Sequence, residues 1–504
     1  MSLPRPDDLF DRVPQWEALS TLVGPPRHRT GLRLGIVSGR RRHGKSYLLR
    51  RLVAAAGGLY HQARELDKAP ALDVFARDVA DHLGYDPAAV RFDSWETALR
   101  VALGLSRPDA RGRRRPGADV LIIDELPYLL AHSPEIPSVL QLLHDEVADD
   151  PQAPTPTVIV CGSALSVMNT LLTGSQPLRG RAQLELTTPP FDFRDSRAYW
   201  EIEDPQVAFE LDAVLGGTPG YRALVTEPPP PHLDGWAAWL GRTVLNPASA
   251  LFNEKAFLLR EDPRNLDRTP YTSLVQAVAD GRRSPTAIGA AVGRDLNTLR
   301  HPLTVLENAG FLVRTDDVLT ARRPTFSLAD PVVRFTQVVV EPHRALLEEG
   351  DTTTAWAAAA PGYSAQVLGP HFEHLARTWT ARYSADRWGT PVGEVGPAVL
   401  NDPAGRTRHE IDVLALARGH RRQDPNAPVI ALGEAKATRR PRTSADLDRL
   451  DALRGLLARS GRNVERTQLA LFSRSGFEVN LVQASAHRAD VHLIDLAELY
   501  DGRS

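Results

Sequence analysis

Short apolar runs that end in glycine or in acidic residues dominate the pattern of the first two hundred residues. Residues 32–37 (LRLGIV), 119–123 (DVLII) and 157–161 (TVIVC) are of this kind. Such runs predict parallel strands that are buried on both faces. Between them, segments such as 71–83 repeat apolar residues every three or four positions, which predicts helices. Strands that alternate with helices predict an α/β fold with a parallel sheet.

The first of these strands leads into a segment with the signature of a phosphate-binding loop. Residues 39–46 read GRRRHGKS and match G-x-x-x-x-G-K-[ST] at every fixed position, and residues 47–56 read as a helix. A strand, a glycine loop and a helix N-terminus together predict an ATP site with its Mg²⁺. Lys45 would reach the β- and γ-phosphates, and Ser46 would bind Mg²⁺. The residues expected to hold the nucleotide here are Gly39, Arg40, Arg41, Arg42, His43, Gly44, Lys45, Ser46 and Tyr47.

The later strands end in residues that suit ATP hydrolysis. Asp124 and Glu125 follow the strand at 119–123, so they would lie at the carboxyl edge of the sheet, where α/β proteins bind ligands. Asp124 would hold Mg²⁺ and Glu125 would polarise the attacking water. Ser163, after the next strand, would either sense the γ-phosphate or cap the following helix. We select Arg181 as the arginine that would reach the γ-phosphate, in its own chain or from a neighbouring copy.

Composition limits the other classes of protein. The chain has 504 residues, too many for one core, and a formal net charge of −2, which gives no overall footprint for nucleic acid. Its one cysteine, Cys161, excludes an intrachain disulfide and favours a reducing, cytoplasmic setting. No stretch has the roughly 18 apolar residues of a membrane span. We therefore expect a cytoplasmic multidomain protein without a membrane partner.

These motifs together resemble the archaeal-type P-loop ATPase family, within the AAA+-related signal-transduction ATPases. The resemblance covers residues from about 8 to about 270, and its most specific parts are the phosphate loop and the segment LGGTPGY at 215–221. It implies an ATPase core at 1–200 and a helical lid over the nucleotide at 201–268. The segment DPVVRF at 330–335 is similar to the family's link between a winged helix and a C-terminal domain.

Residues 269–345 fit a winged helix-turn-helix and its linking helix. Ser284 is a good N-cap for a helix at 285–292, and a recognition helix is expected at 296–308, where Pro302 would introduce a kink. The wing would begin at Gly310. Two interpretations remain open: this domain binds DNA, or it only packs between the lid and the C-terminal domain. The candidates for DNA contact are Arg294, Asn297, Arg300 and His301.

Residues 346–504 carry a second group of acidic residues. Asp412 lies in a predicted strand at 409–416, and Glu434 and Lys436 lie in another at 429–436, where positions i and i+2 share a face. Two carboxylates can bind a divalent metal, and the lysine can position water and stabilise developing charge. The pattern resembles the PD-(D/E)XK nuclease superfamily. That resemblance adds Glu373 as the helix acid among the metal ligands and Gln468 as a later polar member.

The predicted protein is therefore α/β: a P-loop sheet with a helical lid, then a winged helix-turn-helix, then an α/β nuclease-like domain. The first functional hypothesis is an ATP-regulated nuclease that acts on DNA. The alternative is a nucleotide-dependent switch in signalling or transcription whose C-terminal domain only binds DNA or a partner. A homo-oligomer is compatible with both, because an arginine can be supplied in trans.

Overall fold

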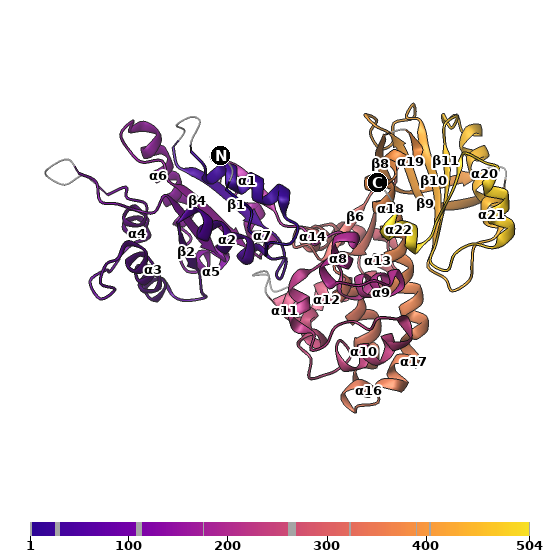
Figure 1. The fold of residues 1–504 in the computed structure, drawn as a ribbon, viewed down its shortest axis with the longest axis horizontal. Helices are drawn as coiled ribbons and strands as arrows, with labels where there is room; N and C mark the ends of the chain where they lie inside the picture. Colours follow the sequence, from indigo (N-terminus) through magenta and orange to yellow (C-terminus); the bar gives the residue numbers. More distant parts are fainter. Residues whose placement is uncertain are drawn as a thin grey trace. The chain divides into compact units, whose positions relative to one another are not determined.

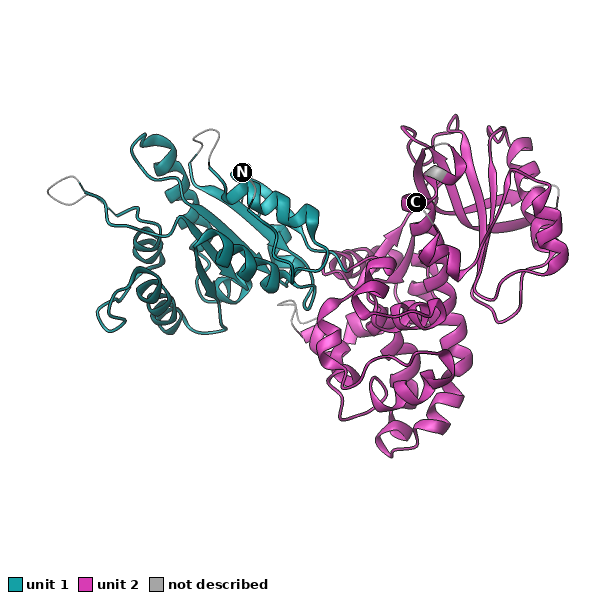
Figure 2. Ribbon diagram, viewed as in Figure 1, with its two compact units in different colours: residues 1–190, 261–263 teal, residues 191–260, 264–504 magenta. Residues whose placement is uncertain are grey.

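The protein forms two compact units. The computed structural model describes residues 3–25, 31–106, 113–174, 176–260, 269–321, 324–389, 391–402 and 405–502. Residues 1–190 with 261–263 form the first unit, and residues 191–260 with 264–504 form the second (Figure 2). Part of the predicted lid, residues 261–268, lies outside the described residues. None of the described helices is both long and apolar enough to cross a membrane.

The first unit is a five-stranded sheet with helices on both faces. The strands occur in the order β2-β3-β4-β1-β5, and each neighbouring pair is parallel. This confirms the predicted P-loop type of α/β fold. Its elements are β1 (Arg33–Ser38), β2 (Leu59–Gln62), β3 (Val120–Asp124), β4 (Thr157–Gly162) and β5 (Ala182–Thr187), with helices α1 (Val13–Val23), α2 (Lys45–Ala56), α3 (Lys68–Leu83), α4 (Trp95–Ala102), α5 (Leu126–Leu130), α6 (Ile136–Asp149) and α7 (Leu165–Thr170).

The apolar runs of this sheet bury alternate residues on opposite faces. In β3, Leu121 and Ile123 pack in the core that includes Phe75 of α3 and Trp95 of α4, whereas Val120 and Ile122 pack in the core of α1 and α2. Because both faces are covered, the strands read as continuous apolar sequence rather than as an alternating pattern. This double burial fixes the strand ends, from which the site residues extend.

The second unit contains a helical region, a small two-stranded sheet and a larger mixed sheet. Its strands are β6 (Leu312–Thr315), β7 (Thr325–Leu328), β8 (Val392–Asp402), β9 (Thr407–Ala417), β10 (Val429–Lys436), β11 (Gln468–Ser473) and β12 (Val491–Ile494). Its helices are α8 (Phe193–Trp200), α9 (Pro205–Leu215), α10 (Trp236–Arg242), α11 (Glu254–Arg260), α12 (Thr269–Ala279), α13 (Pro285–Val292), α14 (Leu296–Asn308), α15 (Pro331–Phe335), α16 (Arg344–Glu348), α17 (Thr352–Gly362), α18 (Gly369–Tyr383), α19 (Ala385–Trp388), α20 (Ser444–Arg459), α21 (Val479–Ala486) and α22 (Leu496–Asp501).

The larger sheet has the order β12-β11-β10-β9-β8. Strands β10, β11 and β12 are parallel to one another, and β9 is antiparallel to both β10 and β8. Figure 1 shows α18 on one side of this sheet and α20 and α21 on the other. Alternate residues of each strand serve the two faces: Val413 packs in the core that includes α18, whereas Leu414 and Leu432 pack in the core that includes α20.

Three local features bear on the expectations. Residues 219–224, inside the predicted helical lid, form a 3-10 turn, η1 (Pro219–Leu224). Helix α14 runs from Leu296 to Asn308 and contains Pro302, so the kink at this proline stays a prediction. Residues 191–200, assigned by sequence to the ATPase core, belong to the second unit, because Phe193 packs edge-on against Tyr383 and Tyr500.

The glycine pair at 216–217 has a structural reason within the second unit. A Cβ on Gly217 would lie 1.9 Å from the carbonyl oxygen of Phe191, and the Phe191 N–H donates a hydrogen bond of 2.7 Å to the Gly217 carbonyl. Gly216 has φ of 63°, which favours glycine. The two glycines therefore let the chain before α8 lie against the turn after α9.

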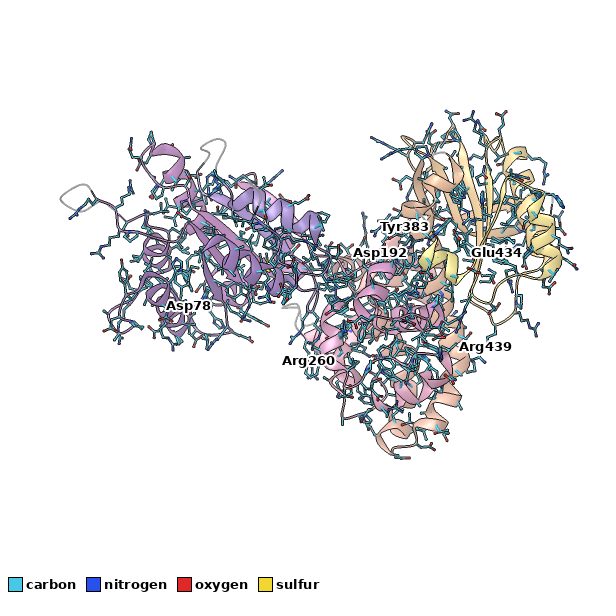
Figure 3. All side chains as sticks on the ribbon, viewed as in Figure 1. Asp78, Asp192, Arg260, Tyr383, Glu434 and Arg439 are labelled. Carbon is cyan, nitrogen blue, oxygen red and sulfur yellow. The ribbon has the colours of Figure 1, made fainter. Side chains whose placement is uncertain are left out.

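Buried polar contacts tie α9 to the larger sheet. Arg474, just after β11, pairs with Glu210 of α9, and Tyr363 donates a hydrogen bond to the same carboxylate. Nearby, Tyr383 donates a hydrogen bond of 2.5 Å to Asp192, and the two side chains lie next to each other in Figure 3. Removing a single partner from a buried pair is costly, so these contacts help to hold the second unit together.

Candidate functional site

The first candidate site lies where β1, β3 and β4 end. Ser38 of β1 pairs with Gly162 of β4, and Ile123 of β3 pairs with Val160. The residues that leave these strands therefore emerge at one edge of the sheet. That edge gathers the phosphate loop, the acidic pair and Ser163.

Two glycines shape the phosphate loop. Gly39 has φ of 155°, and a Cβ there would lie 2.5 Å from Oγ1 of Thr188. Gly44 has φ of 84° and stands immediately before α2. Arg42 also adopts a left-handed backbone, with φ of 66°. The turn is therefore tight, and the N-terminus of a twelve-residue helix faces it.

His43 holds the phosphate loop in place through hydrogen bonds of its side chain and of its backbone carbonyl. Its Nδ1 lies 3.0 Å from the Thr188 carbonyl, and its own carbonyl accepts a hydrogen bond of 3.1 Å from Arg12. Burial, together with the charge of Arg40, lowers the pKa of His43 to about 3. The neutral imidazole therefore fixes the loop to the chain after β5 without adding charge.

Lys45, the invariant cation of the motif, is buried to 4 % exposure. Its Nζ donates a hydrogen bond of 2.9 Å to the Arg40 carbonyl, so the ammonium folds back over the loop. Ser46 is half-buried, whereas Arg41 is exposed. Tyr47 faces away from the loop, because its hydroxyl donates a hydrogen bond of 3.0 Å to Asp8.

The acidic pair is held rigidly at the end of β3. Asp124 is fully buried, and its carboxylate accepts hydrogen bonds from the Tyr60 hydroxyl of β2 and from the Glu125 N–H at 3.0 Å. Burial, followed by the contact with Asp124, raises the pKa of Tyr60, so its hydroxyl keeps its proton. Tyr60 carries no motif in the sequence. Its only signal is its place in the strand beside β3.

Ser163 connects β4 to Glu125. Its hydroxyl donates a hydrogen bond of 2.9 Å, and its N–H one of 3.1 Å, to the same Glu125 oxygen. The cap position of α7 is Ala164, which makes no side-chain cap bond. The Ser163 side chain therefore orients the carboxylate in this structure. Glu125 has φ of 55°, and this left-handed residue turns the chain from β3 into α5.

Arg181 is the predicted residue that the structure does not bring to this edge. It precedes β5, whose first residue, Ala182, pairs with Leu34 near the start of β1. Its guanidinium makes a bidentate pair with Asp145 of α6, at 3.0 Å and 2.9 Å. Leu34 lies roughly 13 Å along the strand from Ser38, the last residue of β1. Arg181 therefore does not reach the phosphate site of its own chain. Its role at the phosphate site of a neighbouring copy stays a prediction.

The second candidate site lies on β9 and β10 of the larger sheet. Lys436 Nζ is 3.3 Å from the Asp412 carboxylate and 3.2 Å from that of Glu434. Asp412 also accepts a hydrogen bond of 2.9 Å from the Ala435 N–H. Burial lowers the pKa of Lys436, but Asp412 and Glu434 outweigh it and raise the pKa overall, so the lysine is charged. The structure therefore brings these three predicted residues together.

Glu373 approaches the same place from α18. Burial raises the pKa of Glu373, and the negative charge of Asp412 raises it further. Arg377, one turn later on α18, donates a hydrogen bond of 2.9 Å to the Asp412 carbonyl and lies 3.8 Å from Glu373. Glu434, labelled in Figure 3, pairs with Arg449 of α20 at 2.7 Å. The two arginines had no motif to identify them.

The cluster of acids fits a divalent cation only in part. Asp412 and Glu434 offer the hard oxygen atoms that Mg²⁺ prefers. However, the described residues contain no group of three or more His, Cys, Asp or Glu side chains that could hold a metal ion. Gln468 pairs with Ala431, five residues before Lys436, and bonds to His492 at 2.9 Å, so it lies away from the acids. Asp412 and Glu434 would be the ligands of any metal ion, and Glu373 stays a predicted third ligand.

Comparison with known proteins gives distant similarities. No family model matches the chain. An uncharacterized protein of Methanocaldococcus jannaschii is 23 % identical over 322 residues, which are 62 % of this chain and 66 % of that protein. The match thus spans slightly less than two thirds of that relative.

Among solved structures, the Walker-type ATPase of Pyrococcus abyssi is similar with a TM-score of 0.48 and 18 % identity, over 67 % of this chain and 98 % of its own. The ORC2 protein of Aeropyrum pernix, in its ADPNP–ADP complexes, gives a TM-score of 0.41 and 15 % identity, over 71 % and 97 % of the two chains. Similarity at this level does not transfer function, which depends on the site.

Proposed function

We propose that this protein binds ATP with Mg²⁺ and hydrolyses it at the carboxyl edge of the first sheet. The observation that supports this most is the convergence of three strand ends. The loop with Lys45 follows β1, the Asp124–Glu125 pair follows β3, and Ser163 follows β4. These are the parts that phosphoryl transfer to water requires.

Each group has a separate role in this proposal. The loop N–H groups and Lys45 would bind the phosphates, for which Lys45 would exchange its bond to the Arg40 carbonyl. Asp124 and Ser46 supply hard oxygen atoms for Mg²⁺, which would neutralise phosphate charge when bound. Glu125, oriented by Ser163, would accept the proton of the attacking water.

Phosphate release by the purified protein tests this proposal. The parent protein should release phosphate from ATP only with Mg²⁺. Lys45→Ala should not release it, and should also bind ATP weakly. Lys68→Ala removes an exposed lysine that pairs with Glu135, and it is the matched control that should keep the parental rate. Hydrolysis by Lys45→Ala at the parental rate would exclude the loop as the site.

We also propose that the second unit is a metal-dependent nuclease that acts on DNA and is regulated by ATP. The supporting observation is that Lys436 lies within ion-pair distance of both Asp412 and Glu434. The two carboxylates would hold the metal that activates water. Lys436, which is charged, would stabilise the negative charge that develops on the phosphate.

Cleavage of supercoiled and linear DNA with Mg²⁺ or Mn²⁺ tests this second proposal. Asp412→Ala, Glu434→Ala and Lys436→Ala should each abolish cleavage but retain ATP hydrolysis. Asp448→Ala, an exposed acid of α20 close in sequence to Arg449, is the matched control. Assays with ATP, ADP and a non-hydrolysable analogue would reveal the regulation. If the parent cuts nothing under any nucleotide condition, the nuclease proposal fails.

A second candidate function is a nucleotide-dependent switch whose second unit only binds DNA or a partner. One observation favours it: Glu434 is paired with both Lys436 and Arg449, so the carboxylate already has two cations. On this alternative, DNA would meet exposed residues of α14 and of the turn before it: Asn297, Arg300 and His301 on the helix and Arg294 in the turn. Unchanged DNA binding by Asp412→Ala, together with no cleavage by the parent, would select this function.

A further inference from the structure

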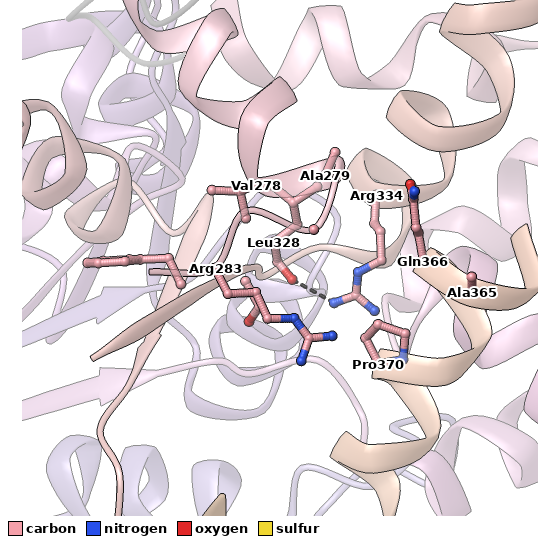
Figure 4. Close-up of a pocket in the computed structure, with 11 residues that line it drawn as sticks. Val278, Ala279, Arg283, Leu328, Arg334, Ala365, Gln366 and Pro370 are labelled. Carbon is pink, nitrogen blue, oxygen red and sulfur yellow. Dashed lines mark hydrogen bonds between the residues drawn. The ribbon is translucent and has the colours of Figure 1, made fainter. Parts of the chain in front are cut away.

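A small cavity in the second unit is lined by two arginines. It has a volume of about 70 Å³ and lies between the end of α12, strand β7, α15 and the start of α18 (Figure 4). Its lining includes Arg283, Arg334 and the amide of Gln366, and it contains no acidic residue. A cavity needs only roughly 10–15 Å³ to hold one water, so this one has room for a small polyatomic ligand.

Arg334 has hydrogen-bonding capacity that the protein does not use. Its Nη2 donates a hydrogen bond of 2.7 Å to the Leu328 carbonyl, but its Nη1 is buried and has no hydrogen-bond partner among the residues that the structure describes. Burial, with a smaller contribution from Arg283, lowers the pKa of Arg334 to about 10, so the group stays charged at neutral pH. A buried charged donor without a partner is costly.

Arg283 lines the same cavity, and its backbone is held in place by strand β7. The Phe326 N–H of β7 donates a hydrogen bond of 2.8 Å to the Arg283 carbonyl, which holds its backbone against the strand. Figure 4 shows its guanidinium and that of Arg334 facing one part of the cavity, beside Pro370. Glu373, which does not line the cavity, forms an ion pair with Arg283 at 3.5 Å. A guanidinium carries five N–H donors, so this pair uses only part of what Arg283 can donate.

We propose that this cavity binds a phosphate group, as inorganic phosphate or as the terminal phosphate of a phosphomonoester. Two converging guanidiniums repel each other, and an oxyanion between them would remove that repulsion and accept the unused N–H of Arg334. Arginine suits this ligand because its planar donors match two phosphate oxygens at once. The small volume favours a terminal phosphate over an internal diester, which carries substituents on two of its oxygens. The proposal goes beyond the proposed function and does not depend on it.

Titration calorimetry with inorganic phosphate tests the proposal directly. Because the phosphate loop also binds phosphate, the full-length chain with Lys45→Ala serves as the parent. That protein should bind phosphate, and sulfate but not chloride should compete at equal ionic strength. Adding Arg283→Gln should weaken binding at least about tenfold, since one charge-assisted donor is lost. Arg283 is half-exposed, and this substitution is therefore compatible with folding.

The matched control is Arg282→Gln, which removes the same charge from the adjacent, exposed residue that does not line the cavity. It should change phosphate binding less than about twofold. Equal phosphate affinity in the parent and in Arg283→Gln would overturn the proposal, and so would equal losses in Arg283→Gln and Arg282→Gln.

The source of the phosphate is resolved by two further titrations. A single-stranded oligonucleotide with a 5′-phosphate should bind more tightly than the same oligonucleotide with a 5′-hydroxyl if the ligand is a nucleic-acid end. AMP should compete with phosphate, and the oligonucleotides should bind equally, if the ligand is a free phosphomonoester. Failure of inorganic phosphate, AMP and the phosphorylated oligonucleotide to bind would refute the site for both sources.

Discussion

Glu125→Gln is the substitution that isolates the proposed general base. Glu125 accepts two hydrogen bonds on one oxygen, from the hydroxyl and the N–H of Ser163. The carbonyl oxygen of glutamine can accept both, and glutamine has the same shape at this left-handed position. The substitution therefore removes charge and basicity while keeping the geometry of the acidic pair.

The expected effect follows from the role of a general base. Such a group contributes about 10²–10⁴-fold to the rate, which corresponds to about 2.7–5.5 kcal/mol of transition-state stabilisation. The turnover of ATP by Glu125→Gln should fall by this factor, whereas ATP affinity should stay near that of the parent. Phosphate release at saturating ATP and Mg²⁺ measures the first quantity, and equilibrium binding measures the second.

Ser163→Ala provides the comparison that makes this test specific. It removes one donor to Glu125 but leaves the N–H of residue 163 and the carboxylate itself. One hydrogen bond to a charged group is worth about 1.5–3 kcal/mol, so turnover should fall by roughly 10- to 150-fold. A Glu125→Gln protein with turnover within about threefold of the parent would refute the assignment of the base.

Three other substitutions examine the remaining structural arguments. Asp124→Asn should reduce the Mg²⁺-dependent part of ATP affinity, measured by binding with and without Mg²⁺, and an unchanged Mg²⁺ dependence would remove Asp124 from the metal site. His43 has a pKa of about 3 when folded, so the unfolded chain binds its proton first as the pH falls below about 6.5, and stability should drop by roughly 1.4 kcal/mol per pH unit. Denaturant unfolding between about pH 4.5 and 6.5 should show a shallower slope for His43→Gln, and equal slopes would contradict the neutral histidine. Arg474→Met should destabilise the second unit by about 3–5 kcal/mol, because it leaves Glu210 buried without its cation. The double variant with Glu210→Gln should recover most of that loss in urea unfolding, and no recovery would show that the pair is not the cause.

The sequence predicted the first sheet well because its signals are local. The apolar runs, the glycine loop and the acidic pair each lie within about ten residues. Parallel strands then bring their carboxyl ends to one edge without further information. Lys45, Asp124, Glu125 and Ser163 were therefore predictable as a group.

The partners of those residues were not predictable, because they depend on strand order and register. Tyr60 reaches Asp124 only because β2 is the neighbour of β3. Arg181 pairs with Asp145 because β5 begins beside the start of β1, at the edge opposite the loop. A single sequence does not state which strands are neighbours.

In the second unit, the sequence revealed the acids but not the charges that surround them. Counting Asp412, Glu434 and Glu373 alone suggests a strongly negative site. Within the described residues, however, the structure surrounds these three carboxylates with four cations: Lys436, Arg449, Arg377 and Arg283.

These surrounding cations affect how well the three carboxylates can bind a metal ion when no DNA is present. A divalent cation would have to compete with the ammonium and guanidinium groups for the same oxygen atoms. A phosphodiester that engages Lys436 or Arg449 would release Glu434 for a metal ligand role. On the nuclease proposal, DNA and metal would therefore bind jointly, and the cleavage centre would assemble only on its substrate.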